Sequence, residues 1–251
     1  MAVEPSPSPA PTSRSGVSCF IVGCVGLGLA TLVACLVFAA LLRATGGEPL
    51  RTLTSDLRSG SLPGFPPLTD RDTLYADDFA DNKAGWREFS GREGSAKVGA
   101  GRLQLTVIGP QQDVWTTMRG SYDDFRIEMD GGLMSGADDT SYGVVFRYQN
   151  DDNYYQFDVD GQGSYTLGRI VNGDYQPIID LTPSDAIQKG QALNHFEVRC
   201  VGPTITVSIN GHQIDQAQDR TFQKGAIGVT AGLDSPSTSE VVFRALRIYR
   251  P

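Results

Sequence analysis

The feature that most constrains the fold is a strict two-residue alternation of apolar and polar residues in the second half of the chain. "TITVSI" (Thr204–Ile209) alternates without a fault and is followed by Asn210-Gly211, a strong two-residue hairpin signal. "DFRIEM" places Phe125, Ile127 and Met129 on one side of a predicted strand. This period is typical of strands that bury one face.

The same pattern recurs along residues 72–251 with turn signals at short spacing. "HFEVRC" places Cys200 on an apolar face, which predicts a small buried core residue. We count about a dozen candidate strands and one short helix candidate, around Ser184–Gln188. The sequence therefore predicts an all-β fold, a two-sheet antiparallel sandwich of the jelly-roll type.

A second constraint is the uncharged run 17–42, "VSCFIVGCVGLGLATLVACLVFAALL". As a helix it would extend about 39 Å, enough to cross a hydrocarbon core of about 30 Å. We predict one transmembrane helix here, retained as an anchor because a secretory signal has a shorter apolar region. Lipid attachment at Cys24 or Cys35 stays open as an alternative.

The flanks of this run complete the predicted organisation. Residues 1–16 are a Pro/Ser-rich tail, residues 43–71 a Gly/Pro/Ser-rich stalk, and residues 72–251 one domain. From Asp70 onward, 17 basic and 26 acidic residues give a net charge of −9, which argues against nucleic-acid binding. Three arginines follow the apolar run and one precedes it, a weak bias toward a cytoplasmic domain.

The stretch "FRYQNDDNYYQFDVDGQGSYTLGRIVNGDY" (146–175) yields the site hypothesis. Loops at 149–152 and 160–163 and a turn at Asn172-Gly173 would pair Arg147 with Tyr154, Asp158 with Tyr165, and Arg169 with Gln176. This register places Val144, Phe146, Tyr155, Phe157, Val159, Ile170 and Tyr175 in the core. It gathers on the opposite face seven predicted ligand-binding residues: Arg147, Tyr154, Gln156, Asp158, Tyr165, Arg169 and Gln176.

Aromatic surfaces with planar polar groups beside them suit sugar binding, since sugars present apolar ring faces and hydroxyl groups. An ordinary solvated sheet face explains the same residues equally well. Trp86 and Trp115 are expected in the core or at its edge.

Other chemistries lack their motifs. "QFDVDG" has Gln156 where an EF-hand begins with Asp and Leu167 where it ends with Glu, so no EF-hand is expected. "EMDGGL" has Leu133 where the glucanase motif Glu-x-Asp-x-x-Glu needs its acid/base Glu. Two histidines make a zinc cluster improbable. We expect no cofactor and leave structural calcium open at Asp77-Asp78, Asp138-Asp139 or Asp151-Asp152.

"YGVVFRYQNDDNYYQFDV", with "GSYTLGRIVNGDY", "LTPSDAI" and the closing "FRALRIY", resembles the laminin-G-like members of the concanavalin A-like lectin/glucanase superfamily. It also resembles the 3-keto-disaccharide hydrolase domain. The resemblance implies a jelly-roll whose concave sheet binds ligand, with Arg147 at a polar position there. It also implies a bacterial domain displayed outside the cell behind a single membrane anchor.

The expected function is binding of a glycan or another extracytoplasmic ligand. A sugar hydrolase of the 3-keto-disaccharide type is one alternative, although no catalytic motif supports it. A structural or sensory domain that binds a partner protein and no small ligand is the other.

Overall fold

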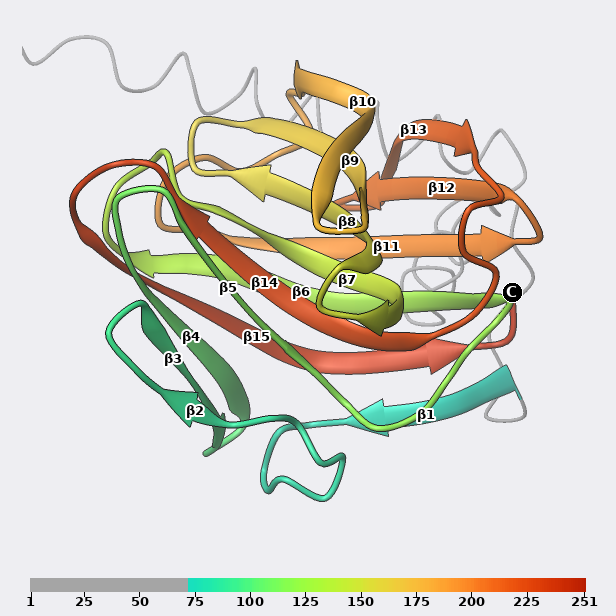
Figure 1. Cartoon of the computed structure of the whole chain (residues 1–251), viewed down its shortest axis with the longest axis horizontal. Coiled ribbons are helices and arrows are strands. Elements are labelled where there is room, and N and C mark those ends of the chain that lie inside the picture. Colours follow the sequence, from blue (N-terminus) through green and yellow to red (C-terminus); the bar gives the residue numbers. More distant parts are fainter. Residues whose placement is uncertain (1–71) are drawn as a thin grey trace, which may run out of the picture. The chain divides into compact units, whose positions relative to one another are not determined.

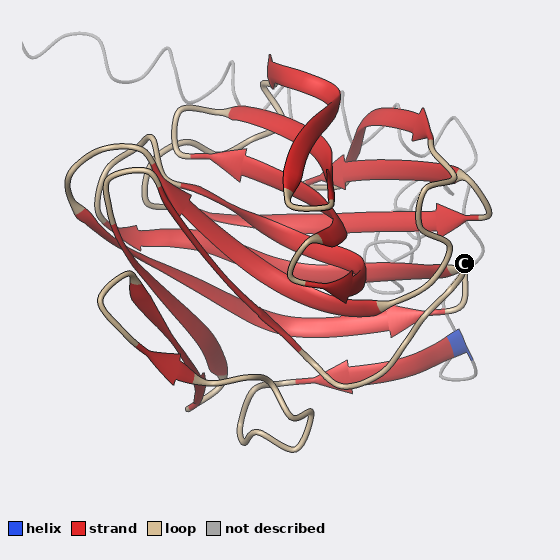
Figure 2. Ribbon diagram, viewed as in Figure 1, coloured by secondary structure: helices blue, strands red, loops and turns tan. Residues whose placement is uncertain are grey.

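The computed structural model describes residues 72–251, and these form two stacked antiparallel sheets (Figures 1 and 2). The predicted all-β sandwich is confirmed. Within these residues there is no helix long and apolar enough to cross a membrane. The predicted span 17–42, the tail 1–16 and the stalk 43–71 all lie outside the described residues.

The larger sheet has nine strands in the order β13-β12-β11-β6-β15-β4-β3-β2, with β1 paired to β15. Their bounds are β1 Thr73–Asp77, β2 Phe89–Ser90, β3 Gly94–Gly99, β4 Arg102–Ile108, β6 Phe125–Ser135, β11 Leu193–Val201, β12 Thr204–Ile209, β13 His212–Gln218 and β15 Thr238–Tyr249.

The smaller sheet has six strands in the order β10-β9-β8-β7-β14-β5 and lies in front of the larger one in Figure 1. Their bounds are β5 Gln112–Thr117, β7 Ser141–Asn150, β8 Asn153–Asp160, β9 Ser164–Val171, β10 Asp174–Pro183 and β14 Ala226–Leu233.

The core lies between the sheets and follows the alternation read from the sequence. Phe125, Ile127, Phe196, Val198 and Cys200 are all fully buried. The core face predicted for β7 and β8 is confirmed at Val144, Phe146, Tyr155, Phe157 and Val159. Trp86 is in the core as expected, with its Nε1 donating to Asp77 Oδ2 at 2.9 Å. The predicted helix around Ser184–Gln188 is wrong: this segment is a turn in which Ile187 N donates to Ser184 O.

The register of β7 against β8 agrees with the prediction only up to Phe146, which pairs with Tyr155. The next pair is Asn150 with Asn153, so three residues of β7 stand against Tyr154 alone. Arg147 begins this bulge and has a φ of 48°, which turns its side chain out of the strand's alternation. The predicted pairing of Arg147 with Tyr154 is therefore wrong.

Arg147 instead lies between the sheets, 1 % exposed. Its guanidinium donates to the carbonyl oxygens of Asp123 (2.9 Å from Nη2), Phe222 (3.1 Å from Nη1) and Gly202 (2.9 Å from Nη2). Nη2 also lies 3.5 Å from Asp124 Oδ1. A planar group with five donors can satisfy several carbonyls at once, which explains an arginine at a buried position.

The register between β8 and β9 differs from the prediction by one residue. The loop has three residues rather than four, because Gly163 adopts a φ of 94° and its N–H closes the turn on Asp160 O. Asp158 consequently pairs with Thr166, Tyr165 with Val159, and Arg169 with Tyr155. The predicted pairing of Asp158 with Tyr165 is therefore wrong.

That shift moves every side chain of β9 to the other face relative to β8. Tyr165 is buried in the core and its hydroxyl donates to Asp215 Oδ2 at 3.1 Å. Ile170 and Tyr175, expected in the core, lie on the outer face instead. The Asn172-Gly173 turn and the pairing of Arg169 with Gln176 are confirmed.

Arg169 and Gln176 lie on the inner side of the sheet near its edge. Arg169 Nε donates to Gln176 Oε1 at 3.0 Å, and its Nη1 donates to Asp219 and Thr221. Tyr155 OH also donates to Asp219, at 2.5 Å. These contacts tie the segment after β13 to the six-stranded sheet.

Candidate functional site

The candidate site lies on the outer face of the six-stranded sheet, the face turned away from the core. Three of the seven residues predicted from the sequence point there: Tyr154, Gln156 and Asp158, all from β8. The other four, Arg147, Tyr165, Arg169 and Gln176, lie on the inner side, as described above. The face predicted to carry all seven residues is thus divided between two sides of the sheet.

Three aromatic side chains from separate strands meet on this outer face. Tyr154 lies 6.2 Å from Trp115 of β5 and 5.8 Å from Tyr148 of β7, measured between ring centroids. Trp115 Nε1 and Tyr148 OH both donate to Asp151 Oδ1, at 3.2 and 2.6 Å. Asp151 therefore sets the orientation of both rings.

The outer face buries several of its own side chains. Val145, Tyr154 and Asp158 belong to it and are only 0 %, 7 % and 3 % exposed. No third layer of strands from residues 72–251 covers them, so the curved sheet and the long side chains around them must exclude the water. We call this outer face of β5, β14, β7, β8, β9 and β10 the concave face.

Asp158 lies on the floor of the concave face. Its Oδ2 accepts a hydrogen bond from Gln156 Nε2, while its Oδ1 is buried and has no partner. Burial raises the pKa of Asp158 to about 7, the Gln156 contact opposes this, and the negative charge of Asp113 adds to it. A buried oxygen without a partner costs free energy unless a ligand supplies a donor.

Glycines make room for the side chains of the floor. A Cβ on Gly143 would lie 2.6 Å from Asp158 Oδ1 and 1.9 Å from Phe157 O. A Cβ on Gly168 would lie 2.3 Å from the ring of Tyr175, whose hydroxyl contacts Thr166 Oγ1 at 2.9 Å. Tyr175 therefore lies against β9 on the outer face, at the end of the sheet far from Trp115.

Asp113 of β5 is a site residue that the sequence analysis missed. A Cβ on Gly232 would lie 2.3 Å from Asp113 Oδ1, so this carboxyl leans across β14 toward the middle of the face. Desolvation and the charge of Asp234 raise its pKa. The signal in the sequence is weak, because Asp113 and Trp115 share a strand face but β5 is distant from β8 along the chain.

The part of the chain that the structure describes contains no group of three or more His, Cys, Asp or Glu side chains placed to hold a metal ion. His195 pairs instead with Asp130, 2.7 Å apart, on the opposite sheet. The chemistry available on the concave face is thus aromatic contact, hydrogen bonding and proton transfer by a carboxyl group.

Known structures share this fold at low sequence identity. A carbohydrate-binding module of Bacillus subtilis, CBM66, is 20 % identical with a TM-score of 0.54, over 67 % of this chain and 97 % of that one. A β-glucanase of Bacillus licheniformis is 12 % identical with a TM-score of 0.52, over 70 % and 98 % of the two chains. A protein of unknown function with a galectin-like fold, also from Bacillus subtilis, is 13 % identical with a TM-score of 0.52, over 71 % and 96 %.

These likenesses confirm the resemblance to concanavalin A-like jelly-rolls noted in the sequence. A search of curated proteins finds no match. The profile of one sequence family matches residues 76–249, which is nearly the whole described domain. The chain therefore belongs to the family of 3-keto-alpha-glucoside-1,2-lyase-like domains.

Proposed function

We propose that this domain binds a glycan on its concave face. The observation that carries the proposal is the buried, unpartnered Oδ1 of Asp158 on the same sheet face as the aromatic cluster of Trp115, Tyr148 and Tyr154. A sugar hydroxyl can donate to that oxygen while an apolar sugar face packs on an aromatic ring. The carbohydrate-binding module and the β-glucanase among the structural neighbours are consistent with this ligand class.

The roles divide by chemistry. Trp115 is half-buried with its Nε1 held by Asp151, so it offers a ring surface of fixed orientation. Asp158 and Gln156 supply the polar contact in the middle of the concave face, and Tyr175 lies on its β10 side. Arg147, Tyr165 and Arg169 keep structural roles, because their polar atoms already contact protein groups.

A glycan array with the full-length chain tests this proposal. The chain is prepared in a detergent without a sugar headgroup, since a glycoside detergent would compete for the site. We expect binding that Trp115→Ala and Asp158→Asn each reduce at least tenfold, and that Tyr165→Phe, a matched change inside the core, leaves intact. Absence of glycan binding together with capture of a defined partner protein would support the protein-interaction alternative instead.

Cleavage of a 3-keto-glycoside is a second candidate function, and Asp158 is the observation that favours it. A carboxyl group with a pKa of about 7 is suited to take up a proton near neutral pH. The 3-keto group acidifies the proton on C2, so Asp158 Oδ1 would remove that proton as the C1–O bond breaks. A C1–C2 double bond forms, and the leaving oxygen departs as an alcohol by taking a proton from water or the proton that Asp158 has gained. This elimination needs one base, not the paired carboxylates of glucanases.

Incubation with a 3-keto-glucoside separates the two functions. Release of the alcohol at a rate that rises as the pH increases through about 7, and that Asp158→Asn abolishes, would establish catalysis. Tight binding without product in the same experiment would leave the domain a binding module.

We propose further that the domain stands outside the cytoplasmic membrane on a stalk, anchored by residues 17–42. The uncharged length of that segment supports the anchor, and the glycan proposal supports exposure to extracellular sugars. Protease treatment of intact cells should release the domain. Protection of the domain until the membrane is broken would refute this orientation.

A further inference from the structure

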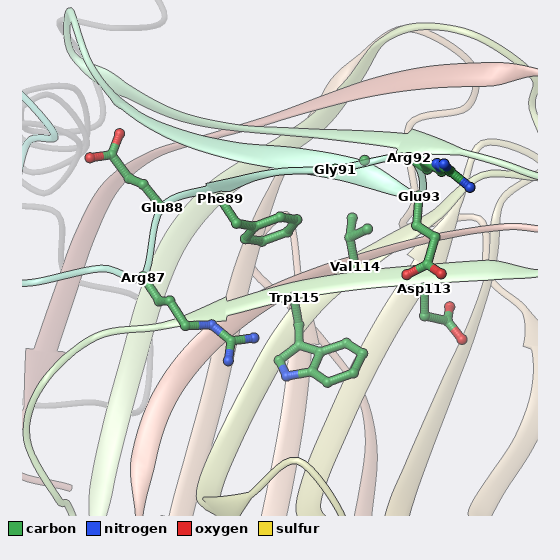
Figure 3. Close-up of a pocket in the computed structure, with 10 residues that line it drawn as sticks. Arg87, Glu88, Phe89, Gly91, Arg92, Glu93, Asp113, Val114 and Trp115 are labelled. Carbon is green, nitrogen blue, oxygen red and sulfur yellow. The ribbon is translucent and has the colours of Figure 1, made fainter.

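A pocket of about 420 Å³ lies beside the concave face, beyond the outermost strand β5 (Figure 3). Residues 84–87 run along one end of β5, where Arg87 N donates to Thr117 O and Thr116 Oγ1 donates to Arg87 O. The rest of β5, toward Gln112, faces the pocket together with the turn between β2 and β3. A volume of this size falls within the range of about 300–1,000 Å³ typical of ligand sites.

Trp115 and Asp113 belong to both the pocket and the concave face. Trp115 packs near Tyr154 on the concave face and also lines the pocket. Figure 3 shows Trp115 and Asp113 projecting from one side of β5, while Val114 and Phe89 lie on the other. The pocket and the concave face are therefore adjacent, with these two side chains between them.

The lining of the pocket combines aromatic and charged groups. Phe89, Val114 and Trp115 provide apolar surface, and Arg87, Arg92 and Glu93 provide hydrogen-bonding groups. Both signs of charge are present, with Glu93 and Asp113 beside the arginines, while the Glu88 carboxyl turns away to accept from Val98 N and Asn82 Nδ2. A mixed lining favours a neutral ligand with many hydroxyl groups over a polyanion, which would meet the carboxylates of Glu93 and Asp113.

The distance from the middle of the concave face to the pocket determines how long a ligand must be to contact both. Asp158 on β8 and Trp115 on β5 are separated by β7 and β14, so three strand spacings of about 4.8 Å place them roughly 14 Å apart along the sheet. One sugar ring cannot contact both the floor at Asp158 and the pocket beyond β5.

We propose that the ligand of the concave face is a neutral oligosaccharide that continues across β5 into the pocket, with the Trp115 indole beneath the sugar at the crossing. This rests on the proposed function and adds the substrate class: a chain of at least three sugars rather than a single terminal residue. Arg92 and Glu93 contact the end of that chain and determine the preference for length.

Calorimetry with two ladders of sugars tests the inference. The probes are glucose and the maltose-to-maltohexaose and laminaribiose-to-laminarihexaose series, with the full-length chain in the same detergent. In the series that binds, we expect affinity to rise at least tenfold from the disaccharide to the tetrasaccharide and then to level off. The double variant Arg92→Ala/Glu93→Ala should abolish this rise and keep the disaccharide affinity.

Arg102→Ala is the matched control, because Arg102 is an exposed arginine at the start of β4 that does not line the pocket. Both changes are on exposed side chains, and a thermal melt checks that the variants fold as the parent does. Equal affinity for all lengths, or an equal loss for disaccharide and tetrasaccharide in the double variant, would overturn the inference while the concave-face proposal stands. Absence of binding by both ladders would overturn the inference, and the array experiment then decides whether the concave face binds glycans at all.

Discussion

Two buried ionisable side chains in the six-stranded sheet differ in how far their hydrogen-bonding groups are satisfied. Arg147, at the bulge of β7, donates to three backbone carbonyls and lies beside Asp124. Asp158, at the centre of β8, receives one hydrogen bond and keeps a buried oxygen without a partner. The arginine region is complete by itself, whereas the aspartate region lacks a donor.

This difference separates a structural charge from a functional one better than burial does. Both residues are at most 3 % exposed, so exposure alone cannot distinguish them. The arginine joins segments 123–124, 202 and 222, which are far apart in the sequence. The aspartate bonds only to its neighbour Gln156, and its unpartnered Oδ1 lies beside Gly143 of β7.

Removal of the arginine should have the largest effect. Arg147→Ala leaves the carbonyls of Asp123, Phe222 and Gly202 buried without donors, and we expect it to reduce the free energy of unfolding by about 4 kcal/mol. Denaturant unfolding of the full-length chain measures this. Arg147→Lys should recover only part of the loss because an ammonium group cannot span the three carbonyls. A loss below 1 kcal/mol for Arg147→Ala would break the contrast.

Replacement of the aspartate should act in the opposite direction. Because the pKa of Asp158 is raised to about 7 in the folded state, the folded chain binds a proton more tightly than the unfolded chain. The stability that comes from this tighter proton binding is fully present below about pH 4 and is lost as the pH rises to about 7. Asp158→Asn should therefore stabilise the protein above pH 7, by up to roughly 4 kcal/mol, and change little at pH 4.

Thermal melts at pH 4, 6 and 8 measure that difference between parent and variant. A gain that grows with pH, combined with loss of sugar binding, would identify Asp158 as a group retained for function at a cost in stability. A variant less stable than the parent at pH 8 would contradict the assignment of the raised pKa.

The glycine floor supports only the aspartate region. Gly143→Ala places a Cβ against Phe157 O and Asp158 Oδ1, and overpacking of this kind costs about 2 kcal/mol. Gly91→Ala is a matched control, since a Cβ there meets nothing closer than Gly94 O at 3.9 Å. Denaturant midpoints should fall for the first variant and stay unchanged for the second. Equal denaturant midpoints for the Gly143→Ala and Gly91→Ala variants would show that the backbone at Gly143 shifts to accommodate a Cβ.

The smallest effect on stability is expected at Tyr175, at the exposed edge of the concave face. Tyr175 is 49 % exposed and its hydroxyl contacts only Thr166 Oγ1, so Tyr175→Phe should cost less than about 1 kcal/mol. Tyr155→Phe, inside the sheet, removes contacts with Asp219 and with Phe222 N and should cost more. A reversal of this order, measured by thermal melts, would show that the rim contributes to the fold as well as to the site.

Much of the fold was predictable, because alternation within an unbroken strand determines which side chains share a face. Phe125, Ile127 and Cys200 are in the core for that reason, and the turn at Asn172-Gly173 follows from residues that tolerate positive φ. The candidate site was predictable only where β8 alone decides it, at Tyr154, Gln156 and Asp158. The predicted anchor at 17–42 and its orientation remain predictions.

What the sequence by itself determined is therefore the class of fold and, within each strand, which side chains share the apolar face. Only the tertiary structure decided which faces of neighbouring strands lie on the same side of the sheet. A bulge at Arg147 and a three-residue turn at Gly163 change the register, and a shift of one residue exchanges the faces of a whole strand. The meeting of Trp115 and Asp113 with Asp158 depends on strand order across the sheet, which is a property of non-local pairing and leaves no local pattern in the chain.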